Sequence, residues 1–231
     1  MRARDWLRPP DDPHVAVERR LLDAALVPQA CVLEAGCGRT TRLAAYRDRI
    51  ARLVGVDVDE EAGRQNSVLD EFVAADLCRR LPFDDATFDL VYANFVLEHI
   101  ADPAAAFAEW HRVLRPGGEV VLLAANARNP VMFLARLLPH GARSSIKHKG
   151  AGADERDVIV AHYSASTPAR LTAFMGRAGF CLLELTCVGT LHRYAGQRRV
   201  LAALLAASET ALPVSLRSTM VGRFRVAAPG A

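Results

Sequence analysis

The chain has 231 residues, of which 51% are hydrophobic and 24% are charged. This length and composition can bury one full core, so we expect a single domain with added segments. The 29 basic and 26 acidic residues give a formal net charge of +3, which lacks the strong excess of one sign typical of a dedicated nucleic-acid binder. No nucleic-acid partner is therefore expected.

The cysteines and the N-terminus indicate the compartment. The five cysteines form no C-x-x-C pair and are odd in number, which argues against a zinc site and against a disulfide framework. No apolar segment follows the basic residues of the N-terminus, and no apolar run approaches the roughly eighteen residues of a membrane span. We expect a cytoplasmic protein without a bound metal, a signal peptide or a transmembrane segment.

The first half of the chain alternates between predicted helices and strands. Residues 14–27 carry apolar side chains at helical spacing and predict an amphipathic helix. Buried parallel strands are predicted for the short apolar runs at 31–35, 52–57, 71–76, 88–94 and 119–125. A helix-length segment occupies 41–51, and a second helix begins at Asp102 and Pro103 and ends at a Pro-Gly-Gly turn.

The second half is less regular. We predict a short apolar helix at 131–138, a polar loop at 139–157 and a further helix from 167. A strand at 181–188, a helix at 197–208 and a last strand at 220–227 follow. The whole pattern predicts an α/β fold with a doubly wound, mostly parallel, seven-stranded sheet, helices on both faces and a lid-like insertion after the fifth strand. We divide this one domain into an N-terminal helical segment, a ligand-binding core, an acceptor-side insertion and a C-terminal helix and strand, at 1–29, 30–126, 127–195 and 196–231.

Candidate ligand-binding residues follow the predicted strands. Glu34 ends the first strand, and Gly36 and Gly38 lie in the turn after it, where the absence of a Cβ allows a sharp bend and a close ligand. Asp57 ends the second strand, so its carboxylate can accept hydrogen bonds from ribose hydroxyls. In an open α/β sheet, ligands bind outside the carboxyl ends of the strands.

Two more strand ends carry polar side chains. Asp76 ends the predicted third strand and can accept a hydrogen bond from an adenine amine, and Asn94 ends the fourth strand and faces the same crevice. Acidic residues at successive strand ends suit a neutral nucleoside with a positively charged tail, and they would repel a phosphate.

Four ordered segments carry a resemblance to a known family. VLEAGCG, VGVD, ADLCRRLPFDDATFDLVYANFVLEHIADP and EWHRVLRPGGEVVLLAAN resemble the successive signatures of Rossmann-like (class I) S-adenosylmethionine-dependent methyltransferases, in particular those acting on small molecules, sugars and lipids. The resemblance covers about residues 30–126. It implies a cytoplasmic transferase that binds S-adenosylmethionine and releases S-adenosylhomocysteine. The cofactor-binding residues that it implies are Glu34, Gly36, Gly38, Asp57, Val58, Asp76, Leu77 and Asn94.

This resemblance assigns the residues to parts of the cofactor. Glu34 and the two turn glycines would approach the methionine part, and Asn94 would line the same side. Asp57 would bind the ribose, while Asp76 and Leu77 would frame the adenine.

The sequence departs from the family pattern in two places. Thr40 stands where the family commonly has a third glycine, so the turn is expected to be tighter or displaced. The segment between Asp57 and Glu71 is short for a complete helix, which predicts a thin wall at the adenine pocket. Thr41 replaces the last glycine of the G-x-G-x-x-G pattern, which disfavours a dinucleotide-binding site.

The sequence indicates the methyl acceptor less clearly than the cofactor. His99 is the candidate general base for an oxygen acceptor, and it has the alternative role of ordering the loop before Asp102. Arg143, Lys147 and Lys149 form, with His148, a basic cluster that suits an anionic acceptor or is simply a solvated loop.

Three functions remain open at this point. The first is in-line transfer of a methyl group to a small-molecule, sugar or lipid-type acceptor at oxygen. The second is a catalytically silent partner subunit that binds S-adenosylmethionine, and the third is a nicotinamide-dependent oxidoreductase. Neither the identity of the acceptor nor the oligomeric state is predicted.

Overall fold

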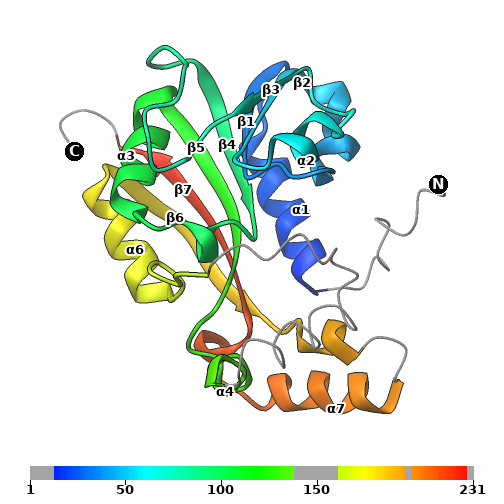
Figure 1. The fold of residues 1–231 in the computed structure, drawn as a ribbon. Coiled ribbons are helices and arrows are strands. Elements are labelled where there is room, and N and C mark those ends of the chain that lie inside the picture. The colour runs from blue at the N-terminus through cyan, green and yellow to red at the C-terminus, as the bar shows by residue number, and fades with distance from the viewer. Residues whose placement is uncertain (1–12, 138–160, 196–198, 228–231) are drawn as a thin grey trace.

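The computed structural model describes residues 13–137, 161–195 and 199–227. Seven strands form one sheet in the order β3-β2-β1-β4-β5-β7-β6 (Figure 1). The strands are β1 Ala30–Ala35, β2 Ile50–Asp57, β3 Glu71–Ala74, β4 Phe88–Asn94, β5 Leu114–Ala125, β6 Phe180–Val188 and β7 Thr219–Val226. The first five are parallel to one another, whereas β7 runs antiparallel to both β5 and β6. The predicted doubly wound, mostly parallel sheet is confirmed.

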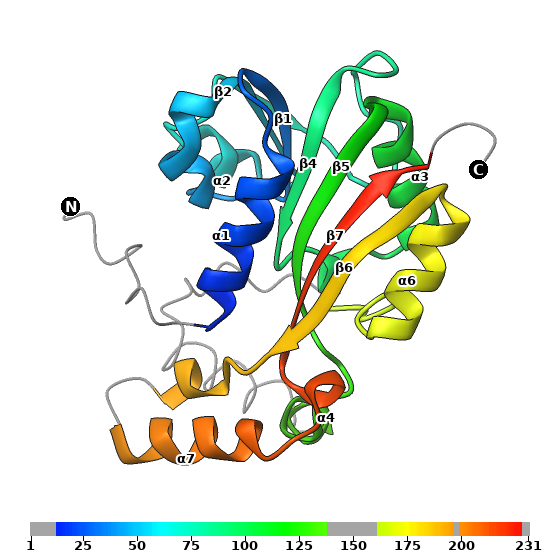
Figure 2. The same ribbon diagram turned by 180° about the vertical axis from the view of Figure 1, so that it is seen from behind.

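Helices cover both faces of this sheet. The α-helices are α1 Pro13–Ala25, α2 Glu60–Arg64, α3 Pro103–Val113, α4 Pro130–Leu137, α6 Pro168–Arg177 and α7 Arg199–Thr210, and the 3-10 helices are η1 Arg42–Arg49, η2 Leu97–His99, η3 Leu191–Ala195 and η4 Val214–Leu216. α1 and η1 pack on one face, while α3 and α6 pack on the other (Figure 2). The chain therefore changes face between β1 and β4, which places the ligand crevice at their carboxyl ends.

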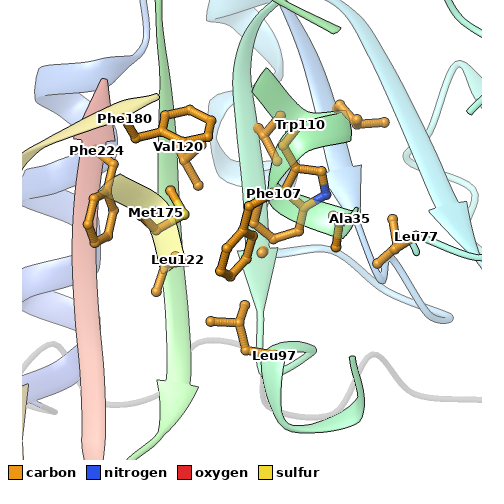
Figure 3. Packing of buried hydrophobic residues seen from close by; sticks show 14 of the residues in the cluster. Ala35, Leu77, Leu97, Phe107, Trp110, Val120, Leu122, Met175, Phe180 and Phe224 are labelled. Carbon is orange, nitrogen blue, oxygen red and sulfur yellow. The ribbon is translucent and has the colours of Figure 1, made fainter. Parts of the chain in front are cut away.

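Aromatic side chains fill the core on the α3 and α6 face. Phe107 and Trp110 of α3 lie with ring centroids 5.1 Å apart and are fully buried. Figure 3 shows them beside Met175 of α6 and the strand residues Val120 and Leu122. Because this packing anchors α3 to the sheet, it fixes the loop that leads from β4 to α3 above the crevice.

The structure corrects the predicted end of the third strand. β3 ends at Ala74, so Asp76 is not a strand-end residue. Asp76 instead forms a turn, in which its Oδ1 accepts a hydrogen bond from the backbone N of Cys78 at 2.8 Å and its carbonyl accepts one from Arg79 N at 3.0 Å. Asp side chains favour such local bonds over continued pairing in a sheet.

Two other predicted boundaries also differ. The segment after β1 is a 3-10 helix rather than an α-helix, and it begins after Thr41, whose hydroxyl accepts a hydrogen bond from Leu43 N at 3.0 Å. The Pro-Gly-Gly turn lies within the bounds of β5, which starts at Leu114. Pairing with β4 passes from Leu114 directly to Glu119, so the residues between them form an irregularity rather than a separate loop. The segment between Asp57 and Glu71, which is short for a complete helix, contains the five-residue α2.

The acceptor-side insertion is described only at its two ends. α4 follows β5 as predicted, and the chain is described again from residue 161. The basic cluster of Arg143, Lys147, His148 and Lys149 lies outside the described residues, as does most of the predicted polar loop. Among the helices that the structure describes, none has the length and apolar character needed to cross a membrane.

Candidate functional site

The turn after β1 depends on two glycines for different reasons. Gly36 and Gly38 have positive φ angles of +71° and +49°. A Cβ on Gly36 would lie 2.5 Å from Cγ2 of Val96, whereas a Cβ on Gly38 would meet no atom of the described residues within 4 Å. Gly36 therefore permits close packing against the loop after β4, and Gly38 exposes backbone toward open space.

Asp57 holds this turn in place. Its Oδ2 accepts a hydrogen bond from Gly38 N at 2.9 Å, and its Oδ1 accepts one from Asp59 N at 2.9 Å. A carboxylate has about four acceptor positions, so both oxygens keep capacity for further donors. Asp57 is half-buried at the end of β2, while Val58 beside it is 62% exposed.

Glu34 and Asn94 contribute buried acceptors. In the described part of the chain, nothing donates a hydrogen bond to Oε2 of Glu34 or to Oδ1 of Asn94, although both atoms are buried. Burial raises the pKa of Glu34 to about 8, partly opposed by a hydrogen bond from Thr41 and reinforced by the negative charge of Asp57. Buried polar atoms without a partner cost stability, so these two are expected to meet a ligand donor.

These acceptors share one face of the sheet. Side chains alternate between faces along a strand, so Glu34, Asp57 and Asn94 lie on the face of Val32, Leu53 and Leu90, which is the face covered by α1. β1 lies between β2 and β4, so the three residues occupy the ends of adjacent strands. The predicted convergence of three of the strand-end residues is therefore present.

Asp76 and Leu77 are placed differently. The side chain of Asp76 is 47% exposed and lies 3.5 Å from Nε of Arg79. Leu77 is buried in the core on the α3 side of the sheet, beside β1 and β2. Leu77 thus lies on the opposite face of the sheet from Glu34, and the adenine-binding role of Asp76 and Leu77 stays a prediction.

His99 lies in η2, just beyond β4, and is half-buried. The chain that returns from the insertion crosses this helix, because the backbone N atoms of His162 and Tyr163 donate to the carbonyl of Glu98 at 2.7 and 3.2 Å. His99, His162 and Tyr163 are thereby brought to one region near the end of β4. Their roles toward an acceptor remain predictions.

Sequence comparisons agree with this geometry. Residues 33–122 match the family model described as "Methyltransferase domain". The chain is 34% identical over 117 residues to the malonyl-[acyl-carrier protein] O-methyltransferase of Pseudescherichia vulneris, covering 47% of this chain and 46% of the relative. It is 30% identical over 165 residues to a ubiquinone biosynthesis O-methyltransferase of Pseudomonas aeruginosa, covering 59% of this chain and 69% of the relative.

A solved structure has the same fold. The S-adenosylmethionine-dependent methyltransferase from Mesorhizobium loti superposes with a TM-score of 0.64 at 19% identity, over 93% of this chain and 98% of that one. The chain belongs to the class I S-adenosylmethionine-dependent methyltransferases. In several of the curated relatives that it matches, the match spans less than two thirds of the relative's length, namely 46%, 30% and 62%.

The residues of this methyltransferase fit its family's cofactor, S-adenosylmethionine. The cofactor has a cationic methionine part and a ribose with two hydroxyl donors. The buried oxygens of Glu34 and Asn94 offer acceptors for the first, and Asp57 has acceptor capacity for the second. The space above Gly38 allows backbone to approach a ligand. This fit rests on the donor and acceptor chemistry of the residues.

The structure also shows a buried polar network that the sequence analysis missed. Glu18 of α1 is 3% exposed, accepts a hydrogen bond from the hydroxyl of Tyr92 and forms a 3.0 Å ion pair with Arg42. Burial, followed by the neighbouring Glu18 charge, raises the pKa of Tyr92 well above its usual value. Because Arg42 follows Thr41, the network supports the turn that holds Glu34.

The same network reaches the acceptor side. Nη1 of Arg42 and Nη1 of Arg193 lie 3.4 and 3.3 Å from Nε2 of His14. A guanidinium has only donors, so Nε2 of His14 can only be the acceptor in these two contacts. The available signal was the spacing of His14 and Glu18 with Leu21 and Leu22, which puts two polar residues on the buried face of the first helix.

Proposed function

We propose that this protein transfers the methyl group of S-adenosylmethionine to an oxygen atom of a small-molecule, sugar or lipid-type acceptor. The two curated relatives described above are both named as O-methyltransferases, one for malonyl-[acyl-carrier protein] and one in ubiquinone biosynthesis. These names support a small acceptor or one carried on a larger group. An anionic acceptor is a further proposal, based on the basic residues of the insertion.

The observation that carries the proposal is the pair of buried, unpartnered acceptor atoms on Glu34 and Asn94 beside the glycine turn. In the ligand-free protein these oxygens are an energetic cost. They are explained if a cationic group with N–H donors occupies the crevice. When bound, S-adenosylmethionine supplies a methyl group already activated by a sulfonium.

The residues of the chain then have distinct roles in positioning. Glu34 binds the cationic amine, Asp57 binds the ribose hydroxyls, and Asn94 lines the methionine side. Asp76, Leu77 and Val58 flank the base and ribose. In-line displacement requires alignment of the acceptor oxygen, the methyl carbon and the sulfur in a dry site, and this alignment supplies most of the acceleration.

His99 is the proposed general base for a hydroxyl acceptor. It lies immediately after β4 in a region covered by the returning chain at His162 and Tyr163. An imidazole can accept the acceptor's proton near neutral pH during or after methyl transfer. If the acceptor is a carboxylate, no base is required, and replacing His99 with Gln would leave the turnover number nearly unchanged.

Binding and turnover must be measured separately to test this function. Titration with S-adenosylhomocysteine should give saturable binding in the wild type and weaker binding in Asp57→Ala. Labelled methyl incorporation should then be measured with phenolic, sugar and acyl-carrier carboxyl acceptors. Binding without transfer to any acceptor in cell extracts would support the silent partner subunit instead, and absence of binding would reject both functions.

A further inference from the structure

An exposed apolar surface lies at the acceptor end of the molecule. α7 is a twelve-residue helix of sequence RVLAALLAASET, in which Val200 and Leu204 are 76% and 62% exposed. On α4, Phe133 and Leu134 are 54% and 62% exposed. Helices of a water-soluble surface normally present polar residues to solvent, so these exposed apolar faces indicate a contact with something else.

The two helices form one surface. Figures 1 and 2 both place α4 and α7 together at one end of the molecule, beyond the end of β6. The start of α4 is tied to η4 and to the end of α7, because Nδ2 of Asn129 donates to the carbonyl of Leu216 in η4 at 2.9 Å and lies 3.5 Å from Oε1 of Glu209 in α7. We call the exposed apolar side chains of this region the α4–α7 face; they are Val131, Phe133, Leu134, Val200, Leu201, Leu204 and Val214.

The charge around this face has one sign. The segments 126–137 and 189–219 contain six arginines and a single acidic residue, Glu209, although the whole chain has nearly balanced charge. Glu209 is 1% exposed, and its oxygens accept hydrogen bonds from the backbone N atoms of Leu191 and Ser218 at 2.7 and 2.8 Å. Of the arginines whose side chains the structure describes here, Arg128 is exposed, Arg217 is half-buried and Arg193 lies against His14. The face therefore presents exposed apolar side chains on segments with an excess of arginine, and no exposed carboxylate among its described residues.

We propose that the α4–α7 face docks on an anionic lipid surface. Exposed apolar side chains on segments that are rich in arginine match a bilayer interface, where apolar groups enter the acyl boundary and basic residues such as Arg128 pair with anionic headgroups. A symmetric pair of chains joined through this face would instead bring two positively charged segments together. α4 directly follows the carboxyl end of β5, so a protein docked in this way presents its crevice side toward the lipid.

Vesicle binding tests this proposal directly. The full chain should co-sediment with vesicles of phosphatidylcholine and phosphatidylglycerol, bind pure phosphatidylcholine vesicles more weakly, and lose binding to the mixed vesicles as salt is raised. The double variant Phe133→Asp with Leu204→Asp should lose roughly tenfold or more in vesicle affinity, because charges replace inserted apolar groups. Arg128→Gln should lose roughly fivefold, and only on the anionic vesicles.

The control is Val27→Asp. Val27 is 50% exposed and precedes β1, so it lies at the opposite end of the parallel strands. This variant should bind vesicles as the wild type does, and all variants should keep the wild-type circular dichroism spectrum and S-adenosylhomocysteine affinity.

The proposal is overturned if the wild type does not bind anionic vesicles, if Val27→Asp loses as much vesicle affinity as the double variant, or if the face instead forms a concentration-dependent dimer that Leu204→Asp abolishes. The proposal does not depend on methyl transfer, so an inactive enzyme would leave it intact.

Discussion

Asp57 combines two tasks in one side chain, because it receives the backbone N–H of Gly38 and keeps acceptor capacity for a ribose. We expect Asp57→Ala to weaken S-adenosylhomocysteine binding by about 1–3 kcal/mol through loss of charge-assisted hydrogen bonds. Calorimetric titration measures the change. Asp57→Asn is the matched control, since it keeps the shape and one acceptor and should lose less. Unchanged affinity in a folded Asp57→Ala variant would remove the ribose assignment.

The two turn glycines should respond differently to substitution. Gly38→Val should abolish cofactor binding and leave a compact protein, because its side chain projects into space that no described residue fills, at a backbone strain of about 1–3 kcal/mol. Gly36→Ala should mainly destabilise the fold, since its Cβ would overlap Val96. Urea denaturation and titration of each variant separate these effects. Normal binding by Gly38→Val would place the site elsewhere.

Glu34 makes both stability and binding depend on pH. Its folded-state pKa of about 8 lies above the ordinary value of 4.5, so the folded protein binds the extra proton between these values. In that window stability falls as pH rises, by up to about 1.4 kcal/mol per pH unit relative to Glu34→Gln. Affinity for a cationic ligand should change in the opposite direction. It should rise from pH 6 to 8, because a larger fraction of the Glu34 carboxyl is ionised at the higher pH. Equal pH slopes for both proteins in denaturation and titration would contradict this.

At the scale of elements, the side-chain amides of Asn126 and Asn129, which follow β5, attach the acceptor side to the sheet. Oδ1 of Asn129 caps α4 by accepting hydrogen bonds from the backbone N atoms of Val131 and Met132, both at 3.0 Å. Nδ2 of Asn126 donates to the carbonyls of Ser215 and Arg217 at 3.0 and 2.8 Å. These amides link the start of α4 to the segment before β7, although the two are far apart in the sequence.

We expect Asn129→Ala to lower the free energy of unfolding by about 1–2 kcal/mol, because the cap and the bond to Leu216 are both lost. Urea denaturation measures this change. Asn129→Ser keeps a capping oxygen and should recover part of the loss. If Asn129→Ser and Asn129→Ala have the same free energy of unfolding, the cap contributes nothing and the bond to Leu216 accounts for the effect.

At the scale of the whole molecule, one continuous sheet joins the cofactor side and the acceptor side. Its last strand, β7, lies between β5 and β6, so the C-terminal segment joins the edge strand β6 to the rest of the sheet. A single cooperative unfolding transition is expected, and saturating S-adenosylhomocysteine should raise its midpoint as binding stabilises only the folded state. Calorimetry with and without ligand tests this, with Asp57→Ala as the control that should shift less. Two transitions, of which one ignores the ligand, would show that the halves fold separately.

Much of the fold and part of the site were predictable because they depend on local patterns. Runs of apolar residues predicted the strands, and the positions of Glu34, Asp57 and Asn94 at strand ends predicted their convergence, since parallel strands present these ends at one edge. The glycines at 36 and 38 indicated a sharp turn for the same local reason. A pattern along the chain records whether a residue is buried and where an element ends.

Only the tertiary structure decided which distant residues meet. The hydroxyl of Tyr92 donates to Glu18, Val96 packs against Gly36, and β7 inserts between β5 and β6, none of which a local pattern encodes. Asp76, which the sequence pattern placed at a strand end, instead forms a turn of its own. Such partners depend on how whole elements pack, because the free energy of a buried charge or a close contact is set by neighbours from other segments.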